Sequence, residues 1–263
     1  MARQTGMHTF QGKLGTTRGF RMKQLEGWFE GMLGGADKNT ILTAPEFVRT
    51  RENMSEFAGS ALAGKRFRNS FGGYPQAIAD VIFTGRTLAL MEKILHFDTV
   101  NPRGQRTIDF FANSTELVGY EMNRFRPFTS MAAMPFTATQ TVTELTIVVP
   151  AFLPTDYLDI PAGATHFVFI YNSQTLSNYE YDVNGYIPST AAGNGSFLNN
   201  FSAPIDLFTL TTAINEATTQ PVGSNGTDQV SIGSFGIIFF QQIGADYYRL
   251  QQNSAMTVVG VAA

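Results

Sequence analysis

The sequence predicts an α+β protein that is mainly β, in which an N-terminal β-arm and a helical hairpin precede an antiparallel β-sandwich. Three observations lead to this fold class. Dense strand patterns lie at residues 144–149 and 166–171, helical apolar spacing is confined to residues 43–97, and the last 137 residues hold seven candidate strands. That number of strands in that length is typical of a β-sandwich.

Residues 1–42 are predicted to form an extended or hairpin arm. Glycines and basic residues alternate there with irregularly spaced aromatic residues, and no helical period is present. Short strands joined by tight turns fit this composition better than a helix does. An arm with so many aromatic side chains needs a surface on which to pack.

Residues 43–126 are predicted to contain a helical hairpin with short strands. The first helix is expected to begin at Thr43, with Glu46 in capping-box position, and the second to run from about Pro75 to Phe97. The helical period predicts that the first helix buries one apolar stripe. Its members are Phe47, Met54, Phe57, Ala58, Ala61 and Leu62.

Residues 127–263 are predicted to form the β-sandwich domain. The alternation of apolar and polar residues, bounded by Gly, Pro and Asn, defines its strands. The candidate strands are 140–149, 165–172, 178–183, 204–211, 229–241, 246–251 and 255–261, and the long loops are 185–203 and 217–228.

The charges of the chain are segregated along the sequence. Of its 18 Lys and Arg residues, 17 lie at or before Arg126, and the remaining one is Arg249. The first 126 residues therefore carry a net charge of about +5, and the rest carry about −8. This asymmetry predicts two electrostatically opposite parts that meet near residue 126.

Composition also limits the environment and the chemistry. The chain has no cysteine, which removes disulfides, thiolate metal sites and thiol nucleophiles. No basic and then apolar leader begins the sequence, and no window is apolar enough to cross a bilayer. We therefore expect a cytoplasmic protein without a membrane span.

No catalytic constellation stands out in the sequence. The segment 59–66, GSALAGKR, has the spacing of a phosphate-binding loop, but Arg66 stands where that loop needs Ser or Thr, and the context is helical. His8, His96 and His166 are far apart in the chain, without a second metal ligand at suitable spacing. We predict no enzyme activity, no cofactor and no metal.

The sandwich lacks the residues that usually protect sheet edges. Exposed strand edges are normally guarded by lysine, inward charges or proline, yet the last lysine of the chain is Lys93. The runs 235–242, FGIIFFQQ, and 256–263, MTVVGVAA, are therefore expected to need cover from other subunits. The predicted assembly interface comprises Arg18, Phe20, Arg21, Trp28, Phe29, Arg49, Arg51, Phe235, Ile237, Phe239 and Val258.

Three functions follow as hypotheses. The first is a structural protein that assembles with itself into a homopolymer, as a tube, filament or shell, through contacts between the arm of one copy and the sandwich of another. The second is a module whose sandwich loops bind glycan or protein, with Tyr179, Tyr181 and Tyr186 able to stack on sugars. The third is association with nucleic acid through the basic first half, and a cargo protein is a further candidate partner.

Four blocks of the sequence resemble a family of uncharacterised Bacteroidota proteins. The blocks are MARQTGMHTFQGKLG at 1–15, FVRTRENMSEFAGSALAGKRFR at 47–68, RGQR at 103–106 and PAFLPTDYLDIPAGATHF at 150–167. After the first block the chain departs from the Phe-Tyr-Lys hairpin of typical members. The resemblance implies a cytoplasmic bacterial origin and supports a two-part architecture, but it brings no activity, cofactor or site residue.

Overall fold

The computed structural model describes residues 2–6, 8–22, 25–219, 226–250 and 254–263. The chain divides into two compact units, which we call the N-terminal unit (Met1–Arg51) and the main unit (Glu52–Ala263). The N-terminal unit carries eight basic and four acidic residues, which gives a net charge of +4. The main unit carries ten basic and seventeen acidic residues, which gives a net charge of −7. Opposite charges thus separate at residue 51.

The N-terminal unit is a small antiparallel sheet followed by a short helix. Its strands are β1 (Ala2–Gln4), β2 (Gly12–Leu14), β3 (Thr17–Arg21) and β4 (Trp28–Met32), in the spatial order β1-β4-β3-β2. Helix α1 (Lys38–Thr43) begins at Asp37, whose carboxylate accepts the backbone N–H groups of Asn39 and Thr40. A 3₁₀ turn, η1 (Pro45–Phe47), then leads into helix α2 (Val48–Asn69).

The helices of the main unit lie in its first half. After α2 come α3 (Pro75–Ile78) and α4 (Phe83–His96), and then the short pieces η2 (Ser114–Leu117), α5 (Phe128–Met131) and α6 (Pro154–Tyr157). The predicted second helix is thus interrupted between residues 78 and 83. There the carboxylate of Asp80 accepts the N–H of Ile82, a local bond that starts a new helix.

Two antiparallel sheets and one hairpin follow. The central sheet contains β7 (His166–Ser177), β10 (Phe197–Phe201), β11 (Ile205–Asp206), β13 (Gln229–Ile243), β14 (Asp246–Arg249) and β15 (Ala255–Ala262), with β7 and β13 paired over twelve residues. The second sheet has the order β12-β6-β5, from β5 (Thr137–Gln140), β6 (Glu144–Val149) and β12 (Ile214–Thr219). The hairpin joins β8 (Tyr179–Asp182) and β9 (Gly185–Pro188).

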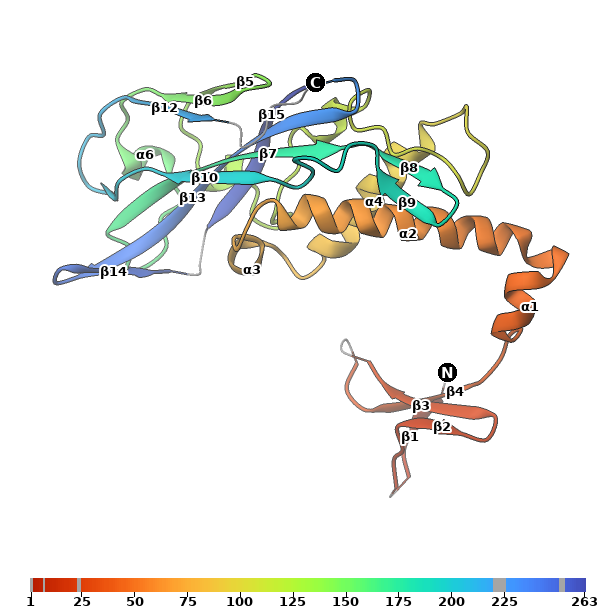
Figure 1. The fold of residues 1–263 in the computed structure, drawn as a ribbon. Coiled ribbons are helices and arrows are strands. Elements are labelled where there is room, and N and C mark those ends of the chain that lie inside the picture. The colour runs from red at the N-terminus through yellow and green to blue at the C-terminus, as the bar shows by residue number, and fades with distance from the viewer. Residues whose placement is uncertain (1, 7, 23–24, 220–225, 251–253) are drawn as a thin grey trace. The chain divides into compact units, whose positions relative to one another are not determined.

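The main unit therefore has three layers, visible in Figure 1 as helices, central sheet and second sheet. One face of β7 and β13, with Ile170 and Ile232, packs on Phe67 of α2 and Met91 of α4. The other face, with Phe169 and Phe235, packs on the second sheet. Because both faces are covered, all residues of β7 after His166 are buried. They include the apolar run 167–171 and also the polar residues 172–175.

The fold class, α+β and mainly β, is confirmed, but the boundary expected near residue 126 does not separate compact units. The helices pack directly on the central sheet, so their apolar contacts override the change in charge along the chain. Among the described residues, four strands were not expected. β5 precedes the candidate strand 140–149 and shares only residue 140 with it, and β9 and β10 lie inside the predicted loop 185–203. β12 runs into the predicted loop 217–228, of which residues 220–225 fall outside the described residues.

Two expectations for the first helix were wrong. Thr43 is not its N-cap, because Thr43 ends α1 and its hydroxyl donates to the carbonyl of Asn39. The buried face of α2 is also not the predicted apolar stripe. The residues that α2 buries are Glu56, Gly59, Ser60, Ala63, Gly64 and Phe67.

Candidate assembly interface

The N-terminal sheet sorts its side chains onto two chemically different faces. In its register Phe29 lies opposite both Phe20 and Arg3, while Arg18 lies opposite Lys13. Residues opposite each other in a sheet share a face, and alternate residues along a strand do too. Arg3, Lys13, Arg18, Phe20 and Phe29 therefore lie on one face, which we call the basic face.

Contacts within the basic face bring its two aromatic rings together and place Arg18 beside them. The rings of Phe20 and Phe29 are 6.4 Å apart, and the guanidinium carbon of Arg18 lies 5.3 Å from the Phe20 ring. The Phe20 ring lies over Gly31, where a Cβ would be at an ordinary contact distance of 3.6 Å from that ring. None of the described strand positions on this face is acidic. The face is positive and aromatic.

The opposite face of the same sheet is partly covered by its own loop. The side-chain amide of Gln4 exchanges hydrogen bonds with the backbone of Phe10, accepting its N–H at 3.0 Å. A Cβ at Gly19 would lie 2.1 Å from the carbonyl oxygen of Phe10, so the loop rests on this glycine. Arg21 and Trp28 lie on this opposite face. The predicted interface residues of the arm are thus divided between two faces.

The N-terminal sheet has no side-chain core. Among the described residues of the N-terminal unit, Gly19 alone is buried, and Met32 is 83% exposed. A small sheet needs a hydrophobic face packed against another layer to be stable. Within the described residues, the N-terminal unit does not supply such a layer for this sheet.

The two arginines predicted at the start of α2 have different surroundings. The Nη1 atom of Arg51 donates to the carbonyls of Ile41 and Ala44, both at 2.8 Å. It thereby satisfies carbonyls at the end of α1 and the start of η1, which is a structural role within the N-terminal unit. Arg49 is exposed.

The predicted interface residues of the sandwich are in the core, which corrects the sequence analysis. Phe235, Ile237 and Phe239 are 0% exposed and Val258 is 1% exposed. The run 235–242 belongs to β13, which is paired with β7 on one side and with β14 and β15 on the other. Its hydrophobicity reflects a central position in the sheet and not an exposed edge.

The outer edge of β15 is covered by the chain itself. Gly119 N donates to Val258 O at 2.8 Å, Met122 N donates to Met256 O at 3.0 Å, and Val258 N donates to Tyr120 O at 3.1 Å. The start of the run 256–263 is therefore sheltered by the segment 119–122. The expected exposed edge is absent over residues 256–258.

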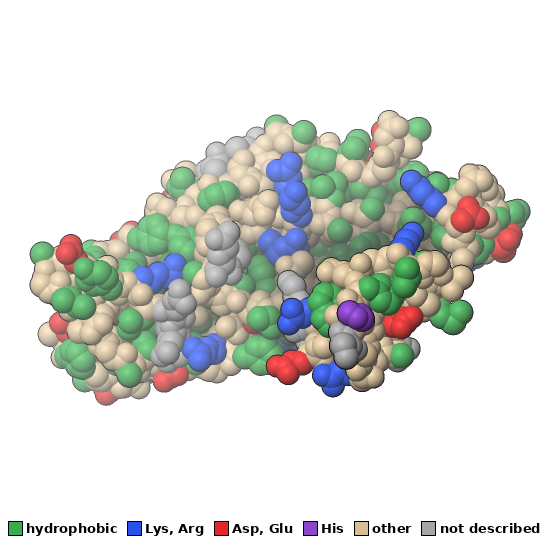
Figure 2. All heavy atoms as spheres, turned by 90° about the horizontal axis from the view of Figure 1, so that it is seen from below, with side chains coloured by type: hydrophobic (Ala, Val, Ile, Leu, Met, Phe, Trp, Pro, Cys, Tyr) green, Lys and Arg blue, Asp and Glu red, His purple; other side chains and the backbone are tan. Residues whose placement is uncertain are grey.

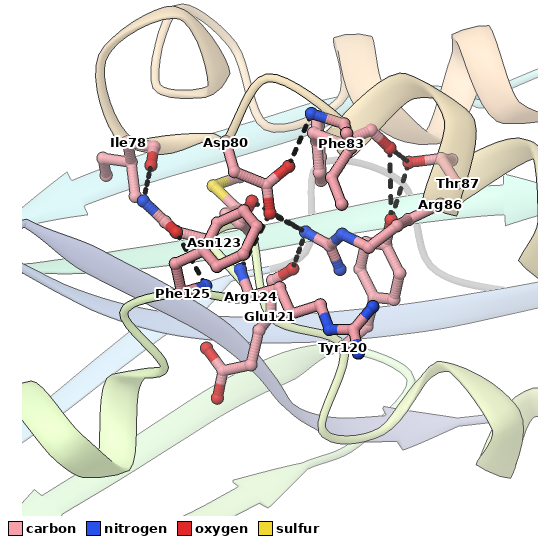
Figure 3. A network of polar contacts seen from close by, with 12 residues as sticks. Ile78, Asp80, Phe83, Arg86, Thr87, Tyr120, Glu121, Asn123, Arg124 and Phe125 are labelled. Carbon is pink, nitrogen blue, oxygen red and sulfur yellow. Dashed lines mark hydrogen bonds and ion pairs between the residues drawn. The ribbon is translucent and has the colours of Figure 1, made fainter.

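A polar network anchors that covering segment to the helices (Figure 3). Asp80 accepts Arg86 Nη2 and the N–H of Arg124, both at 2.9 Å, and its side chain is only 3% exposed. Arg86 Nη2 also donates to the carbonyls of Glu121 and Met122 at 2.9 and 3.0 Å. The network fixes residues 120–124 beside β15, which explains how a lysine-free strand is protected.

One edge strand of the central sheet does expose apolar residues without charge. β10 has the sequence FLNNF and, in the described structure, pairs only with β7. Phe197 and Leu198 are each 40% exposed, and Phe201 is 54% exposed. The absence of lysine predicted an unprotected strand edge of this type. The sequence analysis, however, assigned this segment to a loop.

The motif at 59–66 is a helix-packing surface. Gly59 faces the ring of Tyr186, and Gly64 faces Thr87 and Met91 of α4. The phosphate-loop spacing thus results from small residues in a close helix contact, within α2. Across the described residues, no three His, Asp or Glu side chains come together as a metal site.

A pocket of about 430 Å³ lies beside the turn after α4 and is lined by Asp98, Asn101, Thr107 and Asp109 among others. Burial alone would raise the pKa of Asp98, but hydrogen bonds from the backbone of Thr107 and from Asn101 outweigh it and lower this pKa to about 2. The Asp98 carboxylate is therefore used by the turn itself.

The tyrosines considered for glycan stacking do not form an exposed platform. Tyr179 is 1% exposed and Tyr186 is 9% exposed, while Tyr181 is 37% exposed and packs edge-on against Tyr186. Two of the three rings thus belong to the core of the main unit.

Comparison with known proteins gives no relative: no protein-family model, curated protein or solved structure matches the chain. No helix in the described part of the chain is long and apolar enough to span a membrane. Figure 2 shows one face of the molecule with exposed hydrophobic side chains between separate Lys and Arg side chains.

Sequence reasoning missed Arg3 and Lys13 as members of the basic face. Both lie on three-residue strands, which are too short for alternation to define a face without the strand register. The arm composition signalled a basic aromatic segment, but the pairing of β1 with β4 and of β2 with β3 was needed to assemble it.

Proposed function

We propose that this protein is a non-catalytic structural subunit that assembles with copies of itself into a homopolymer in the cytoplasm. The N-terminal unit of one copy packs on the main unit of the next copy, through the basic face. A contact between two unlike surfaces leaves one free surface of each kind at the ends of the chain of copies, so assembly continues as a ring or a filament.

The observation that carries the proposal is the missing core of the N-terminal sheet. Phe20 and Phe29 bring two aromatic rings together, yet within the described residues both rings remain only half-buried. Covering such rings with another protein surface contributes about 25 cal/mol for each Å² of apolar area buried. A partner surface thus supplies what this sheet lacks.

The charges support the main unit as that partner. The N-terminal unit carries +4 and the main unit carries −7, so unlike units of two copies attract each other while like units repel. The exposed, uncharged β10 edge offers a further surface on the main unit for contact between copies. Assembly driven by these charges weakens as salt rises.

The test is assembly of the purified full chain at low and high ionic strength. Sedimentation velocity and negative-stain electron microscopy should find polymers at low salt and smaller species at high salt. Particles of only 28.8 kDa at low salt and high protein concentration would refute the proposal.

A pair of arginines in β3 gives a matched control. Arg18 lies on the basic face and Arg21 lies on the opposite face of the same strand. Arg18→Glu should reduce the polymer mass strongly and raise the protein concentration needed for assembly about tenfold or more. Arg21→Glu should raise that concentration less than about threefold. Equal effects of both substitutions would show that net charge, and not the basic face, matters.

The basic face also favours a second candidate function, the binding of single-stranded nucleic acid. Two aromatic rings on neighbouring central strands, flanked by three cations, are the features on which bases stack and phosphates are held. Fluorescence anisotropy with a labelled oligonucleotide should then show affinity that falls steeply with salt and is lost in Phe20→Ala. Unchanged anisotropy at low salt would remove this candidate.

A further inference from the structure

A small pocket lies beside β11 and β12, at one edge of the central and second sheets. It has a volume of about 180 Å³ and is lined by Ile205, Ile214 and Glu216 among others. The two sheet edges are joined next to it, because Asn200 Nδ2 of β10 donates to Thr218 Oγ1 of β12 at 3.3 Å. Among the described residues that line this pocket, Glu216 alone is charged.

Glu216 occupies a strand position that normally holds a core residue. In the pairing of β12 with β6, Glu216 lies opposite Ile147 and Thr218 lies opposite Leu145. Ile147 and Leu145 are buried in the core between the two sheets, so Glu216 is on the same inward face of the second sheet. No ion pair of this carboxylate forms within the described residues.

A second polar group near the pocket has no partner either. Tyr171 of β7 is buried in the same core, and its hydroxyl makes no hydrogen bond within the described structure. Burial raises the pKa of this hydroxyl, and the negative charge of Glu216 raises that pKa further, so the two side chains lie near each other. A carboxylate and an unpartnered hydroxyl at one opening suit a cation that carries several N–H donors.

The size and the charge of the pocket define the chemistry of its ligand. Sites for small molecules usually measure roughly 300 to 1,000 Å³, so a pocket of about 180 Å³ suits a single side chain. A guanidinium binds a carboxylate through two parallel hydrogen bonds and keeps further N–H groups for a neighbouring oxygen. Ile205 and Ile214 provide an apolar wall for the aliphatic stem of such a side chain.

We propose that this pocket, which we call the Glu216 pocket, receives the Arg18 side chain of a second copy. The inference rests on the proposed function and names the surface of the main unit on which the basic face packs. The contact joins the positive N-terminal unit of one copy to the negative main unit of another.

Arg18 is the cation of the basic face that is best placed for this contact. It is exposed on β3, a central strand of its sheet, with its guanidinium beside the Phe20 ring. The Arg3 side chain lies against its own sheet, since a Cβ at Gly27 would be 2.8 Å from Arg3 Nε. Lys13 lies on the edge strand β2 and offers a point charge without the planar donor pair of a guanidinium.

The rim of the pocket matches the aromatic rings of the basic face. The connection from β11 to β12 carries Phe208 and Leu210, which are 64% and 70% exposed, just before Thr211, which lines the pocket. Phe20 and Phe29 of the basic face are only half-buried. A charged pair surrounded by apolar contacts that exclude water is typical of interface hot spots. The two surfaces are thus complementary in charge and in apolar area.

Exchange of the two charges tests the contact in the full chain at low ionic strength. Glu216→Arg should raise the protein concentration needed for assembly about tenfold or more, because like charges then face each other. The double variant Arg18→Glu, Glu216→Arg should return to within about threefold of the unsubstituted chain. A double variant that assembles no better than either single variant would overturn the inference.

Glu144 provides the matched control, because it is exposed on the outer face of the same sheet. The double variant Arg18→Glu, Glu144→Arg restores the net charge equally, but it should assemble as poorly as Arg18→Glu alone. Equal recovery in both double variants would show that net charge, and not the Glu216 pocket, controls assembly. Urea unfolding at high ionic strength verifies that each variant is folded.

A milder substitution keeps the test sharp if an arginine at the inward position disturbs folding. Glu216→Gln removes the charge and nearly preserves the shape, and it should raise the concentration needed for assembly about threefold or more. Glu144→Gln should change that concentration less than about twofold. Equal effects of the two glutamine variants would count against the Glu216 pocket.

A mixture of single variants shows whether the contact joins different copies. Arg18→Glu and Glu216→Arg should each assemble poorly alone, but an equimolar mixture should form polymers. The intact basic face of one variant then meets the intact Glu216 pocket of the other. Recovery in the double variant without recovery in the mixture would place the contact within one chain and would overturn the inference.

The outcomes separate this inference from the proposed function. Polymers that are lost in Arg18→Glu but unchanged by both Glu216 substitutions would overturn the inference and leave the proposed function standing. Particles of only 28.8 kDa from the unsubstituted chain at low salt would refute the proposed function, and the contact between copies with it.

Discussion

The tight contact between Gly59 and Tyr186 leads to a prediction about stability. Replacement of Gly59 by Ala would place a methyl group 2.5 Å from Cγ of Tyr186 and 2.6 and 2.7 Å from its two Cδ atoms. These atoms form the base of the ring and cannot move aside as the tip of a long side chain can. Tyr186 belongs to β9 and is 9% exposed, so the hairpin β8–β9 must shift with it.

Two terms of opposite sign set the magnitude. Overpacking a well-filled site costs typically about 1 to 3 kcal/mol. Alanine gains about 0.5 to 1 kcal/mol over glycine within a helix. The Gly59→Ala substitution should therefore lower the free energy of unfolding by about 1 to 2 kcal/mol.

Gly85 in α4 provides the control, because a Cβ there has no atom within 4 Å. Gly85→Ala should raise the free energy of unfolding by about 0.5 to 1 kcal/mol. Urea unfolding followed by circular dichroism, at high ionic strength where polymers dissociate, would measure both. If Gly59→Ala were as stabilising as Gly85→Ala, the contact between α2 and the Tyr186 ring would not be as tight as the structure shows, and the reasoning would be refuted.

Two further predictions concern the main unit. Asp80→Asn should lower the free energy of unfolding by about 3 kcal/mol, because it leaves the charge of the mostly buried Arg86 without its carboxylate. Hydrogen exchange should also become faster at the amides of Met122 and Val258. Unchanged exchange at these amides would show that the network does not hold the edge of β15. Asp98 has a pKa lowered from 3.8 to about 2 in the folded protein, so its stabilisation is present above about pH 4 and is lost as the pH falls toward 2. Asp98→Asn should thus destabilise the protein at pH 7 but much less at pH 2, and an equal loss of unfolding free energy at both values would contradict this assignment.

The local patterns of the sequence located most of the regular structure. Alternation in 144–149 and the apolar run at 166–171 correspond to β6 and β7, and the runs at 229–241 and 255–261 correspond to β13 and β15. The arm was expected to contain short strands, and its described residues form four. These elements were predictable because hydrophobic period and turn residues are local properties.

The sequence by itself determined the fold class, the basic aromatic character of the arm and the segregation of charge, because these depend on composition and on the order of residues. Only the tertiary structure decided which surfaces are free. From its sequence β13 resembles an exposed hydrophobic edge strand, and only its pairing on both sides shows that it is central. The apolar stripe of α2 resembles a core-facing stripe, and only the contact between Gly59 and the Tyr186 ring shows that another face of the helix is buried. Burial is a property of what packs against a residue from distant parts of the chain, and no local pattern contains that information.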